Sequence, residues 1–482
     1  MSFDLSNAVN PAKVFMTNSS GLEPRWDPNY YKGMSAFQER VKDCAFPIEK
    51  LKSSLALAQY GISERATDDP IGVPMLRMIN LQDDTWDLSD LKFIDMAEGD
   101  KKRYLVEAGD ILFNRTNSKE LVGKCGVFNA TGEYVFASYL IRVRLKEGAL
   151  LPDYVTAFLS SSVGRLQIDA VSRQIAGMTN INAEEIRGLL IPVADRATQE
   201  KVVKAWRTAI LNRDQTLTKA SHILSTVDDV LLRELGVSRQ TEAVNSIEQR
   251  IFLASSAKLT GCRWDPLFHK ANVFHFIGGA ACGLVRLGEL ANYMISGFAA
   301  GRDDQANQEA GIVQIRPTNL SDDRELVFHR NVYIAASEIN ARRRDVLLRR
   351  EVLFNNTNSQ ELVGKTVWFD LDGPYFSSNH ITRIAADPGR LDAQYLSHVL
   401  NLYQRRKVFF KLCTNWNNQS GVGTDILQRV PIPLPSLARQ VEIVGQLENI
   451  RCQARTLRLR ARTELESSKR EIEALILGRN SK

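Results

Sequence analysis

The sequence NRTNSKELVGK, residues 114–124, recurs as NNTNSQELVGK, residues 355–365. Each copy follows an apolar run that ends in phenylalanine, and the two copies lie 241 residues apart in a chain of 482. This period is far longer than the roughly 20 to 50 residues of a solenoid repeat, so each copy is expected to have a hydrophobic core of its own. The chain is therefore predicted to contain two similar domains, which indicates two similar targets.

Other pairs of motifs keep nearly the same offset, which extends the repeat over both halves of the chain. Arg25-Trp26-Asp27-Pro28 corresponds to Arg263-Trp264-Asp265-Pro266. Further matches are Arg77 and Asn80 with Arg316 and Asn319, Tyr154 with Tyr395, Ile191-Pro192 with Ile432-Pro433, and Gln199 with Gln440. Each half is thus predicted to be one copy of the repeat.

Composition excludes several classes of protein. Hydrophobic residues make up 44% and charged residues 24% of the chain, as in ordinary globular proteins rather than disordered ones. The chain begins without a secretory signal and has no apolar stretch near the ~18 residues of a membrane helix, so a cytoplasmic location without membrane contact is expected. The six cysteines show no CxxC spacing, which implies neither a zinc site nor a disulfide framework.

Basic residues are in modest excess, with a net charge of +6 and a pI near 8.9, which is compatible with a polyanionic partner. Lys101-Lys102-Arg103 stands 241 residues before Arg342-Arg343-Arg344. A single basic triplet is usually a solvated face, whereas a duplicated triplet favours contact with phosphate groups.

Each half divides into a mixed body and a helical tail. The bodies carry short apolar runs rich in Val, Ile, Phe and Tyr, separated by Gly, Asn and Asp turn signals, which predicts α+β domains with a twisted, largely antiparallel sheet. The predicted division is a first body at 1–195, a central helix at 196–236, a second body at 237–436 and a C-terminal helix at 437–482.

The two long helices are predicted from apolar or small residues that recur at alternating spacings of three and four. These residues are Val203, Trp206, Ile210, Leu217, Ala220, Leu224, Val227 and Leu231 in the first half, and Val444, Leu447, Ile450, Ala454, Leu457, Ala461, Leu465, Ser468, Ile472 and Leu475 in the second. A narrow stripe suits a helix pair, so an antiparallel coiled coil with pseudo-twofold symmetry is expected. The alternative is that each helix packs only on its own body.

Features that could indicate catalysis are incomplete. Asp27-Pro28-Asn29-Tyr30 is one residue away from the D-P-P-Y loop of adenine methyltransferases, but no apolar strand precedes it and no glycine-rich cofactor loop occurs elsewhere. Residues 359–366 resemble a phosphate-binding P-loop, but Ser359 stands where the first glycine is needed. None of the six histidines is shared by the two copies. No catalytic residue, cofactor or metal is therefore expected.

The side chains that the copies share suit nucleic acid, because asparagine pairs with adenine, arginine with guanine and lysine with phosphate. Loops 114–118 and 355–359 carry this chemistry, although Asn and Ser clusters also satisfy turns. Sequence discrimination is expected where the copies differ, as in residues 172–174 against 415–419 and residues 63–65 against 301–304. The candidate DNA-binding residues are Asn114, Arg115, Thr116, Asn117, Ser118, Lys124, Lys101, Lys102, Arg103, Arg173, Asn355, Asn356, Thr357, Asn358, Ser359, Lys365, Arg342, Arg343, Arg344, Arg302 and Asn417. Two different readers would recognise a bipartite, non-palindromic site.

Several motifs in a fixed order point to one family. They are Arg25-Trp26-Asp27-Pro28-Asn29-Tyr30-Tyr31, Leu287-Gly288-Glu289-Leu290 with Ser296-Gly297, the block from Gly109 to Lys124 with its repeat, and Ile432-Pro433-Leu434-Pro435 before Gln440. Over almost its whole length the chain resembles the specificity subunits of Type I restriction-modification systems. The first half has no clear counterpart of Leu287-Gly288-Glu289, offering only Leu51 and Gly61 near that place.

The resemblance implies two tandem target-recognition domains, held apart by two antiparallel helices that fix the spacing between half-sites. It implies a non-catalytic subunit that binds double-stranded DNA and directs two adenine methyltransferase (modification) subunits, which use S-adenosylmethionine. The presence of restriction subunits that translocate and cut with ATP stays open. Two other interpretations also stay open: the specificity subunit of a related phage-defence methylation system without a classical nuclease, and a coiled-coil protein scaffold without DNA contact.

Overall fold

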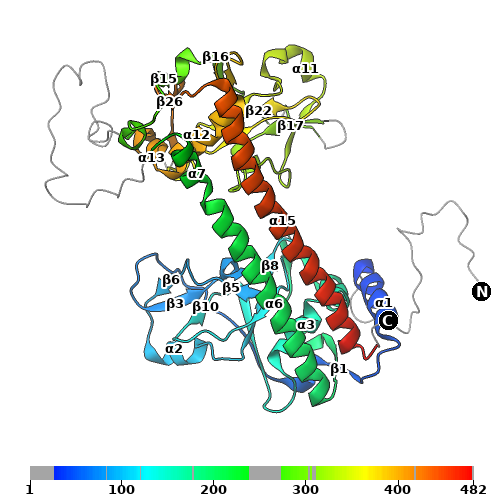
Figure 1. Cartoon of the computed structure of the whole chain (residues 1–482). Helices are drawn as coiled ribbons and strands as arrows, with labels where there is room; N and C mark the ends of the chain where they lie inside the picture. Colours follow the sequence, from blue (N-terminus) through cyan, green and yellow to red (C-terminus); the bar gives the residue numbers. More distant parts are fainter. Residues whose placement is uncertain are drawn as a thin grey trace, which may run out of the picture. The chain divides into compact units, whose positions relative to one another are not determined.

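The computed structural model describes residues 27–82, 84–119, 121–175, 178–237, 273–301, 304–306, 311–416 and 419–479. The chain folds into two compact units (Figure 1). Unit 1 contains the residues up to Thr218 and those from Arg458 onward, and unit 2 contains Lys219 to Leu457. Blue and red segments, from opposite ends of the sequence, therefore belong to the same unit.

The central sheet of unit 1 consists of four antiparallel strands. In spatial order they are β2 (Leu55–Tyr60), β11 (Leu140–Leu145), β7 (Ile111–Asn114) and β9 (Cys125–Val127). Successive side chains of a strand point to opposite faces. On β7, Phe113 packs in one core with Phe158, whereas Leu112 packs in another core with Phe136. Both faces of β7 are thus covered, which explains the continuous apolar run before the repeated motif.

Unit 2 repeats this sheet order with β16 (Ala291–Ser296), β23 (Ile381–Ala386), β19 (Val352–Asn355) and β21 (Thr366–Trp368). Three smaller sheets also recur. The first contains β10 (Val135–Phe136), β3 (Val73–Leu76) and β6 (Lys92–Ile94) in unit 1, and β22 (Phe376–Ser377), β17 (Gly311–Ile315) and β18 (Val332–Ala335) in unit 2. The second contains β12 (Arg173–Ile175), β13 (Met178–Asn180) and β8 (Thr116–Asn117) in unit 1, and β24 (Thr414–Trp416), β25 (Gln419–Gly421) and β20 (Thr357–Asn358) in unit 2; the third pairs β1 (Ile48–Lys50) with β14 (Leu190–Pro192) in unit 1, and β15 (Leu284–Arg286) with β26 (Pro431–Pro433) in unit 2. A further pair is β4 (Leu81–Gln82) and β5 (Thr85–Trp86). Among the named strands, only β10 with β3 and β22 with β17 pair in parallel.

Helices flank the sheets of both units. They are α1 (Pro28–Val41), α2 (Glu98–Tyr104), α3 (Pro152–Leu159), α4 (Ser162–Val171) and α5 (Ala183–Gly188) in unit 1, and α7 (Val227–Glu234), α11 (Glu338–Ala341), α12 (Ala393–Arg405), α13 (Val408–Leu412) and α14 (Thr424–Leu427) in unit 2. Asp27 caps α1 by accepting a hydrogen bond from the main-chain nitrogen of Asn29, and Pro28 occupies the first turn. The methyltransferase-like motif is therefore a helix start, and its second copy lies outside the described residues.

A buried arginine in each central sheet holds the segment that carries the basic triplet. Arg383 is 2% exposed and donates to both carboxylate oxygens of Glu351, at 2.7 and 3.1 Å, and to the main-chain oxygen of Arg344 at 2.6 Å. Arg142, 241 residues earlier and 4% exposed, donates to the main-chain oxygen of Arg103 at 3.0 Å. Because the main chain of each triplet bonds inward, Arg103 and Arg344 direct exposed side chains to solvent.

The repeated tyrosines and glutamines fix the start of each long helix. The hydroxyl of Tyr154 donates to the main-chain oxygen of Pro192 at 2.8 Å, and Tyr395 makes the same bond to the equivalent proline. The buried amides of Gln199 and Gln440 bond main-chain groups on both sides of this junction. These positions of the repeat are therefore structural.

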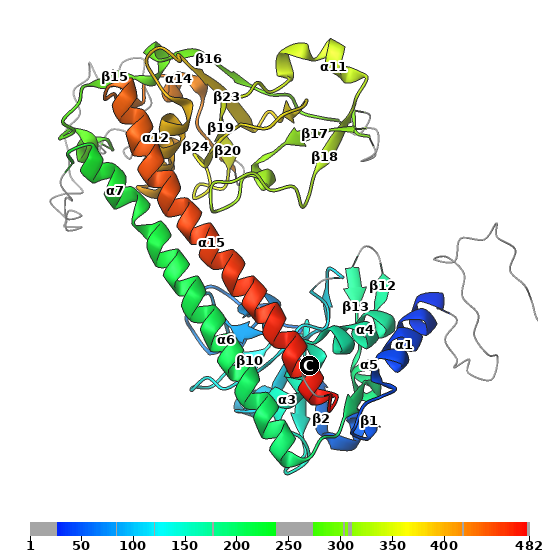
Figure 2. The same ribbon diagram turned by 45° about the vertical axis from the view of Figure 1, so that its right-hand side comes forward.

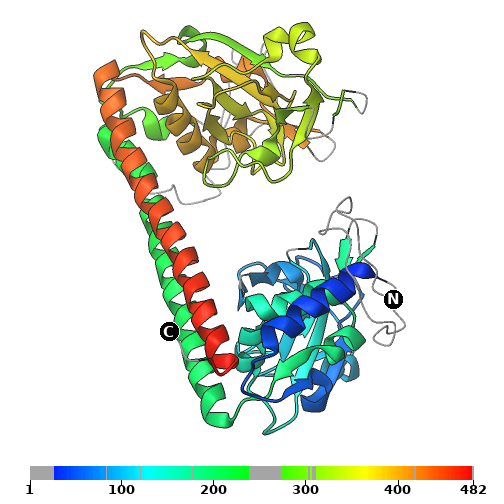
Figure 3. The same cartoon turned by 90° about the vertical axis from the view of Figure 1, so that its right-hand side faces the viewer.

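The long helices are α6 (Arg196–Ser225) and α15 (Leu437–Ile476). Every position of the predicted apolar stripes is buried or half-buried. Within unit 1, Trp206 of α6 shares a core with Ile472 of α15, while Leu217 and Ala461 line one cavity. In this unit the two helix segments thus run side by side in opposite directions (Figures 2 and 3).

The region predicted as one central helix, 196–236, contains a break between α6 and α7. The hydroxyl of Thr226 donates to the main-chain oxygen of Ile223 at 2.7 Å, and the main-chain nitrogen of Thr226 bonds the same oxygen at 3.1 Å. A threonine hydroxyl that competes for a helix carbonyl in this way commonly interrupts or bends a helix.

The first half does contain a counterpart of Leu287-Gly288-Glu289. These residues form a short 3₁₀ helix between β15 and β16, and Leu51–Ser54 form the equivalent turn between β1 and β2. Leu51 and Leu287 are both buried. Leu51, which the sequence offered near this place, is therefore the counterpart of Leu287, and it is the only one of the three residues that is shared.

Three further features of the chain concern membrane-spanning helices, metal-binding groups and disulfides. Within the parts that the structure describes, no helix is both long and apolar enough to span a membrane. The same residues include no group of three or more His, Cys, Asp or Glu side chains placed to hold a metal ion. Cys44, Cys125, Cys282, Cys413 and Cys452 are free thiols, and burial raises the pKa of Cys125 far above its ordinary value.

Candidate nucleic-acid interface

The repeated motif folds as a closed loop between two strands of the central sheet. The main-chain nitrogen of Gly123 donates to the oxygen of Asn114 at 2.8 Å, and Gly364 makes the same bond to Asn355 at 2.9 Å. Gly364 has a φ of 91°, and a Cβ at this position would lie 2.3 Å from Phe409. Only glycine fits there, so the glycine of the Gly-Lys pair is required to close the loop.

Five of the predicted DNA-binding residues lie in the interior: Asn114, Thr116, Asn355, Asn356 and Lys365 are each at most 8% exposed. The side-chain nitrogen of Asn356 donates to the main-chain oxygen of Asn379 at 3.1 Å and to the hydroxyl of Thr382 at 2.9 Å. Lys365 forms an ion pair with Asp322. These five side chains are therefore buried within the loop and are not exposed at its surface.

The outer part of each loop lies in a small three-stranded sheet. In unit 1, β8 pairs with β13, whose hairpin partner is β12; in unit 2, β20 pairs with β25 and then β24. Asn117 and Asn358 are half-buried and each accepts a hydrogen bond from the main-chain nitrogen of the next serine at 2.8 Å. Ser118 and Ser359 are exposed. Each shared loop is thus brought beside a hairpin in which the two copies differ.

The hairpins carry the predicted contacts Arg173 and Asn417. Arg173 is exposed and its guanidinium lies 3.0 Å from the carboxylate of Glu185. Asn417 and Arg302 lie outside the described residues. Arg115 and Lys124 are half-buried, and Thr357 is half-buried on β20.

Exposed rings near these sheets were not predicted as contacts. The guanidinium of Arg115 lies 4.8 Å from the ring centre of Tyr60, which is 40% exposed. Trp416 is 46% exposed, and its indole lies so close to Gly421 that a Cβ there would be 2.4 Å from the ring. Exposed aromatic rings suit apolar contact with bases. The only sequence signal was that Trp416 stands in a segment that differs between the copies.

Each basic triplet lies on the surface of its own unit. Lys101 pairs with Glu133 at 2.7 Å, and Arg342 lies 4.0 Å from the ring centre of Phe298 and pairs with Glu338 at 3.2 Å. The other members, Lys102, Arg103, Arg343 and Arg344, are exposed. Figure 2 shows α11, which leads into the second triplet, beside β17 and β18, with β20 nearer to α15. The structure therefore does not bring the triplet and the shared loop of unit 2 together.

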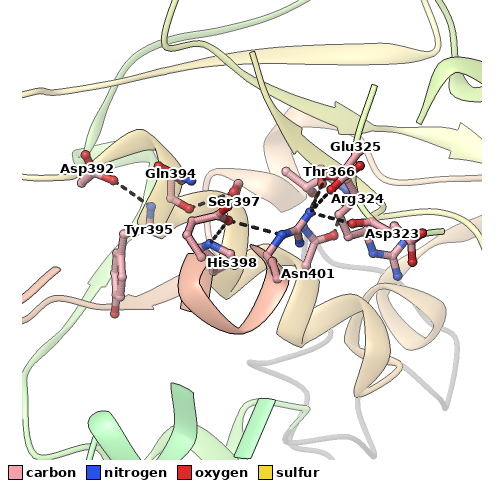
Figure 4. Close-up of polar contacts among 12 residues, drawn as sticks. Asp323, Arg324, Glu325, Thr366, Asp392, Gln394, Tyr395, Ser397, His398 and Asn401 are labelled. Atoms are coloured by element: carbon pink, nitrogen blue, oxygen red, sulfur yellow. Dashed lines mark hydrogen bonds and ion pairs between the residues drawn. The ribbon is translucent and has the colours of Figure 1, made fainter. Parts of the chain in front are cut away.

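A polar groove of about 370 Å³ in unit 2 contains a histidine. Figure 4 shows His398 and Asn401 on α12, beside the segment that carries Asp323, Arg324 and Glu325. The Nε2 atom of His398 lies 3.3 Å from a carboxylate oxygen of Glu448, and the side chain is 4% exposed. Burial lowers the pKa of His398 below its ordinary value of 6.5.

This histidine should make unit 2 sensitive to acid. Below about pH 6.5 the unfolded chain binds a proton that buried His398 resists, so stability present above that pH is lost as pH falls. Glu448 and Arg451 face the imidazole and modulate the effect. Urea unfolding, followed by hydrogen exchange of α12, should show a lower midpoint at about pH 5.5 than at about pH 7.5. His398→Leu should reduce this difference, and exposed His329→Gln should keep it; an unchanged pH dependence in His398→Leu would contradict the assignment.

Three sequence relatives of the chain are all described as specificity subunits of type I restriction enzymes. The Type I restriction enzyme EcoKI specificity subunit of Escherichia coli (strain K12) is 25% identical over 182 residues, which cover 37% of this chain and 39% of that protein. A putative type I restriction enzyme MjaX specificity subunit of Methanocaldococcus jannaschii is 23% identical over 190 residues, 39% of this chain and 44% of that protein. The chain therefore spans about two-fifths of the length of these two relatives. The Type I restriction enzyme StySPI specificity subunit of Salmonella potsdam is 21% identical over 390 residues, 80% of this chain and 76% of that protein.

Solved structures were compared as well. A chain described under complex assembly and conformational transition of the type I R-M system has a TM-score of 0.43 and 14% identity, and the match covers 90% of this chain and 98% of that chain. The HsdS subunit from Thermoanaerobacter tengcongensis has a TM-score of 0.30 and 14% identity, with 89% and 95% covered. No protein-family model matches the chain. The resemblance predicted from the motifs is confirmed by the sequence relatives.

Proposed function

We propose that this chain, a relative of the Type I restriction enzyme specificity subunits, is the DNA-reading subunit of a modification or restriction-modification complex and carries no catalytic centre itself. It recognises a bipartite, asymmetric site in double-stranded DNA and directs two adenine-modification subunits to that site. The observation that carries the proposal is the pair of small sheets, in which one shared loop stands beside a hairpin that differs between units. The shared loop would give both units the same orientation on DNA, and the differing hairpins would let the units recognise different bases.

Each unit contacts its half-site through exposed or half-buried residues of this sheet. In unit 1 these are Arg115, Asn117, Ser118 and Arg173, and in unit 2 they are Thr357, Asn358, Ser359 and the β24–β25 hairpin. Asparagine and arginine read base edges in the major groove, and serine bonds bases or phosphates. The two basic triplets neutralise phosphates further from the read bases.

The long helices serve as the spacer between the readers. In this proposal, target-recognition domains at 1–195 and 237–436 are separated by helical segments at 196–236 and 437–482, which pack as an antiparallel coiled coil. The apolar stripes and the antiparallel contacts within unit 1 support this packing. Modification subunits, and restriction subunits where a system has them, dock on these helices. The complex works on cytoplasmic DNA.

A genome-wide map of N6-methyladenine, with and without this gene and with the modification genes intact, tests the proposal. The expected result is that a bipartite motif loses methylation on deletion, because the modification subunits lose their guide. An unchanged map from a strain in which the gene is expressed would reject the assignment.

A variant of the second triplet separates a DNA reader from a protein scaffold. Changing Arg342, Arg343 and Arg344 to Glu should weaken DNA binding and reduce the slope of log K against log salt by about one for each arginine that had bound a phosphate. The control is Arg429→Glu, which makes one such charge reversal at an exposed residue of the same unit outside the triplet. This variant should bind DNA as the wild type does. Fluorescence anisotropy over a salt series measures both quantities. Absence of DNA binding by the wild type, together with protein partners that are retained in the triple variant, would favour the scaffold.

A further inference from the structure

A cavity in unit 1 that is lined by several basic side chains does not include the first basic triplet. It has a volume of about 570 Å³ and is bounded by α6, α15, the start of α4 and the end of the repeated motif. Its cationic lining residues are Lys124, Arg165, Arg213, Arg458, Arg462, Lys469 and Arg470, and its acidic ones are Asp84, Glu466 and Glu473. The lining cations outnumber the lining carboxylates by seven to three. Arg165 and Arg213 are paired with Asp169 and Asp214 just outside the lining, and the cavity keeps an excess of positive charge.

Two of the three carboxylates are already engaged. Glu473 accepts hydrogen bonds from the hydroxyl of Ser162 at 2.7 Å and from Arg40 at 2.8 Å, and so holds α15 against α4. Asp84 accepts a hydrogen bond from the hydroxyl of Ser160 at 2.9 Å and lies 3.4 Å from the ammonium of Lys469. Asp84 thus offsets the charge of Lys469, and within the described part of the chain neither acid forms an ion pair with Arg462 or Arg470.

The arginines of α15 are arranged as one face. Arg458 and Arg462 are four residues apart, and Lys469 follows two turns later, so all three project to the same side of the helix. Arg462 and Arg470 are exposed and form no ion pair with any residue that the structure describes. Exposed guanidinium groups that line a cavity bind phosphate oxygens in a bidentate manner.

The cavity adjoins the reading sheet of unit 1. Gly123 and Lys124 line it, and the main-chain oxygen of Lys124 accepts a hydrogen bond from the nitrogen of Asn114 at 2.8 Å. The same loop continues through Asn117 and Ser118, the proposed base contacts. One loop therefore carries both the proposed base contacts and part of the cavity lining.

We propose that this cavity binds a phosphate group of the DNA backbone next to the half-site read by unit 1; this rests on the proposed function. The equivalent positions 241 residues earlier carry Leu217, Ser221, Asp228 and Asp229, none of which is basic. Unit 2 therefore lacks an equivalent row of basic residues, and phosphate binding is stronger at the half-site read by unit 1. An acidic segment of a partner protein is the competing ligand.

The test uses the full chain with its modification subunits and the duplex identified from the methylation map. The double variant Arg462→Gln with Arg470→Gln should lower affinity about tenfold at low salt and reduce the salt slope by about one to two. It should do so equally for duplexes with altered half-sites, because phosphate contacts carry no sequence information. Arg460→Gln is the matched control, since Arg460 is exposed on the same helix, pairs with Glu464 at 2.7 Å and does not line the cavity.

Interference by ethylated phosphates locates the contact. The inference predicts that the wild type, and not the double variant, is inhibited by ethylation beside the unit 1 half-site. Wild-type binding with the same slope and interference pattern in the double variant would overturn the inference alone, and so would loss of partner subunits at unchanged DNA affinity. Failure of the wild type to bind the duplex would overturn the proposed function and this inference together.

Discussion

Glu351→Leu is expected to lower the free energy of unfolding of unit 2 by about 3–5 kcal/mol, because it leaves the buried guanidinium of Arg383 without its counter-charge. Both side chains of this ion pair are 2% exposed, so water cannot replace the carboxylate. Glu351 also accepts a hydrogen bond from the main-chain nitrogen of Leu348 at 2.9 Å and one from the hydroxyl of Tyr293. Urea unfolding, with hydrogen exchange of β19 and β23 as the unit-specific readout, measures the loss.

Two further variants show whether breaking the charge pair is the cause. The double variant Glu351→Leu with Arg383→Met should recover much of the stability, since removing both buried charges is far less costly than removing one. Arg349→Gln, which breaks an exposed ion pair with Asp370, should change little. A double variant as unstable as Glu351→Leu would indicate that shape, and not charge, is what the site requires. Burial and the hydrogen bond to Glu351 raise the pKa of Tyr293 to about 12, so loss of Glu351 should also shift the phenol titration downward.

Removing one heptad from the 203–231 segment, with a matched heptad from α15, is expected to shorten the recognised spacer by about three base pairs while both half-sites stay the same. Seven helical residues span about 10 Å, and each base pair rises about 3.4 Å. Sites with the original spacing could then engage only one reader, which costs roughly 10²–10⁴-fold in overall affinity. Methylation mapping of cells that carry the variant measures the new spacing directly.

The control for this deletion keeps helix length and changes only helix surface. Alanine at exposed positions of the same heptad, such as Leu211 and Asn212, should leave the spacer unchanged. Continued methylation at the original spacing in the shortened variant would mean that the helices are not the ruler. A change in half-site sequence would mean that the helices take part in base reading.

The two-domain repeat could be predicted from the sequence because the repeated motif is a run of consecutive residues. Consecutive residues that are nearly identical in the two copies specify one loop, and the glycine in each copy has a single physical reason, a close approach to Phe409 or its counterpart in unit 1. The apolar run before each copy likewise indicates a strand covered on both faces. The apolar stripe of each long helix was visible for the same reason, since its spacing of three and four requires no distant residue.

What the sequence concealed depends on residues far apart in the chain. Arg383 and Glu351 are separated by 32 residues and look like ordinary surface charges until the sheet brings them together. Asn114 and Asn355 were predicted as base contacts because their side chains have suitable chemistry, yet they lie at the buried end of a strand. Trp416 lies in the segment that was expected to discriminate sequence, and its ring is 46% exposed, although it was not among the predicted contacts. The burial of these side chains depends on how distant strands pair, and a local sequence pattern does not predict that pairing.

The last turns of α15 belong to unit 1, and this has a consequence for how the chain is made. A ribosome delivers Lys219 to Leu457 as one continuous stretch, so unit 2 has all its residues before unit 1 does. Unit 1 starts first but lacks Ile472, Glu473 and Ile476 until all of unit 2 has been synthesised, so its core stays incomplete during that time. Loss of the final helical turns would therefore harm the unit that was translated first.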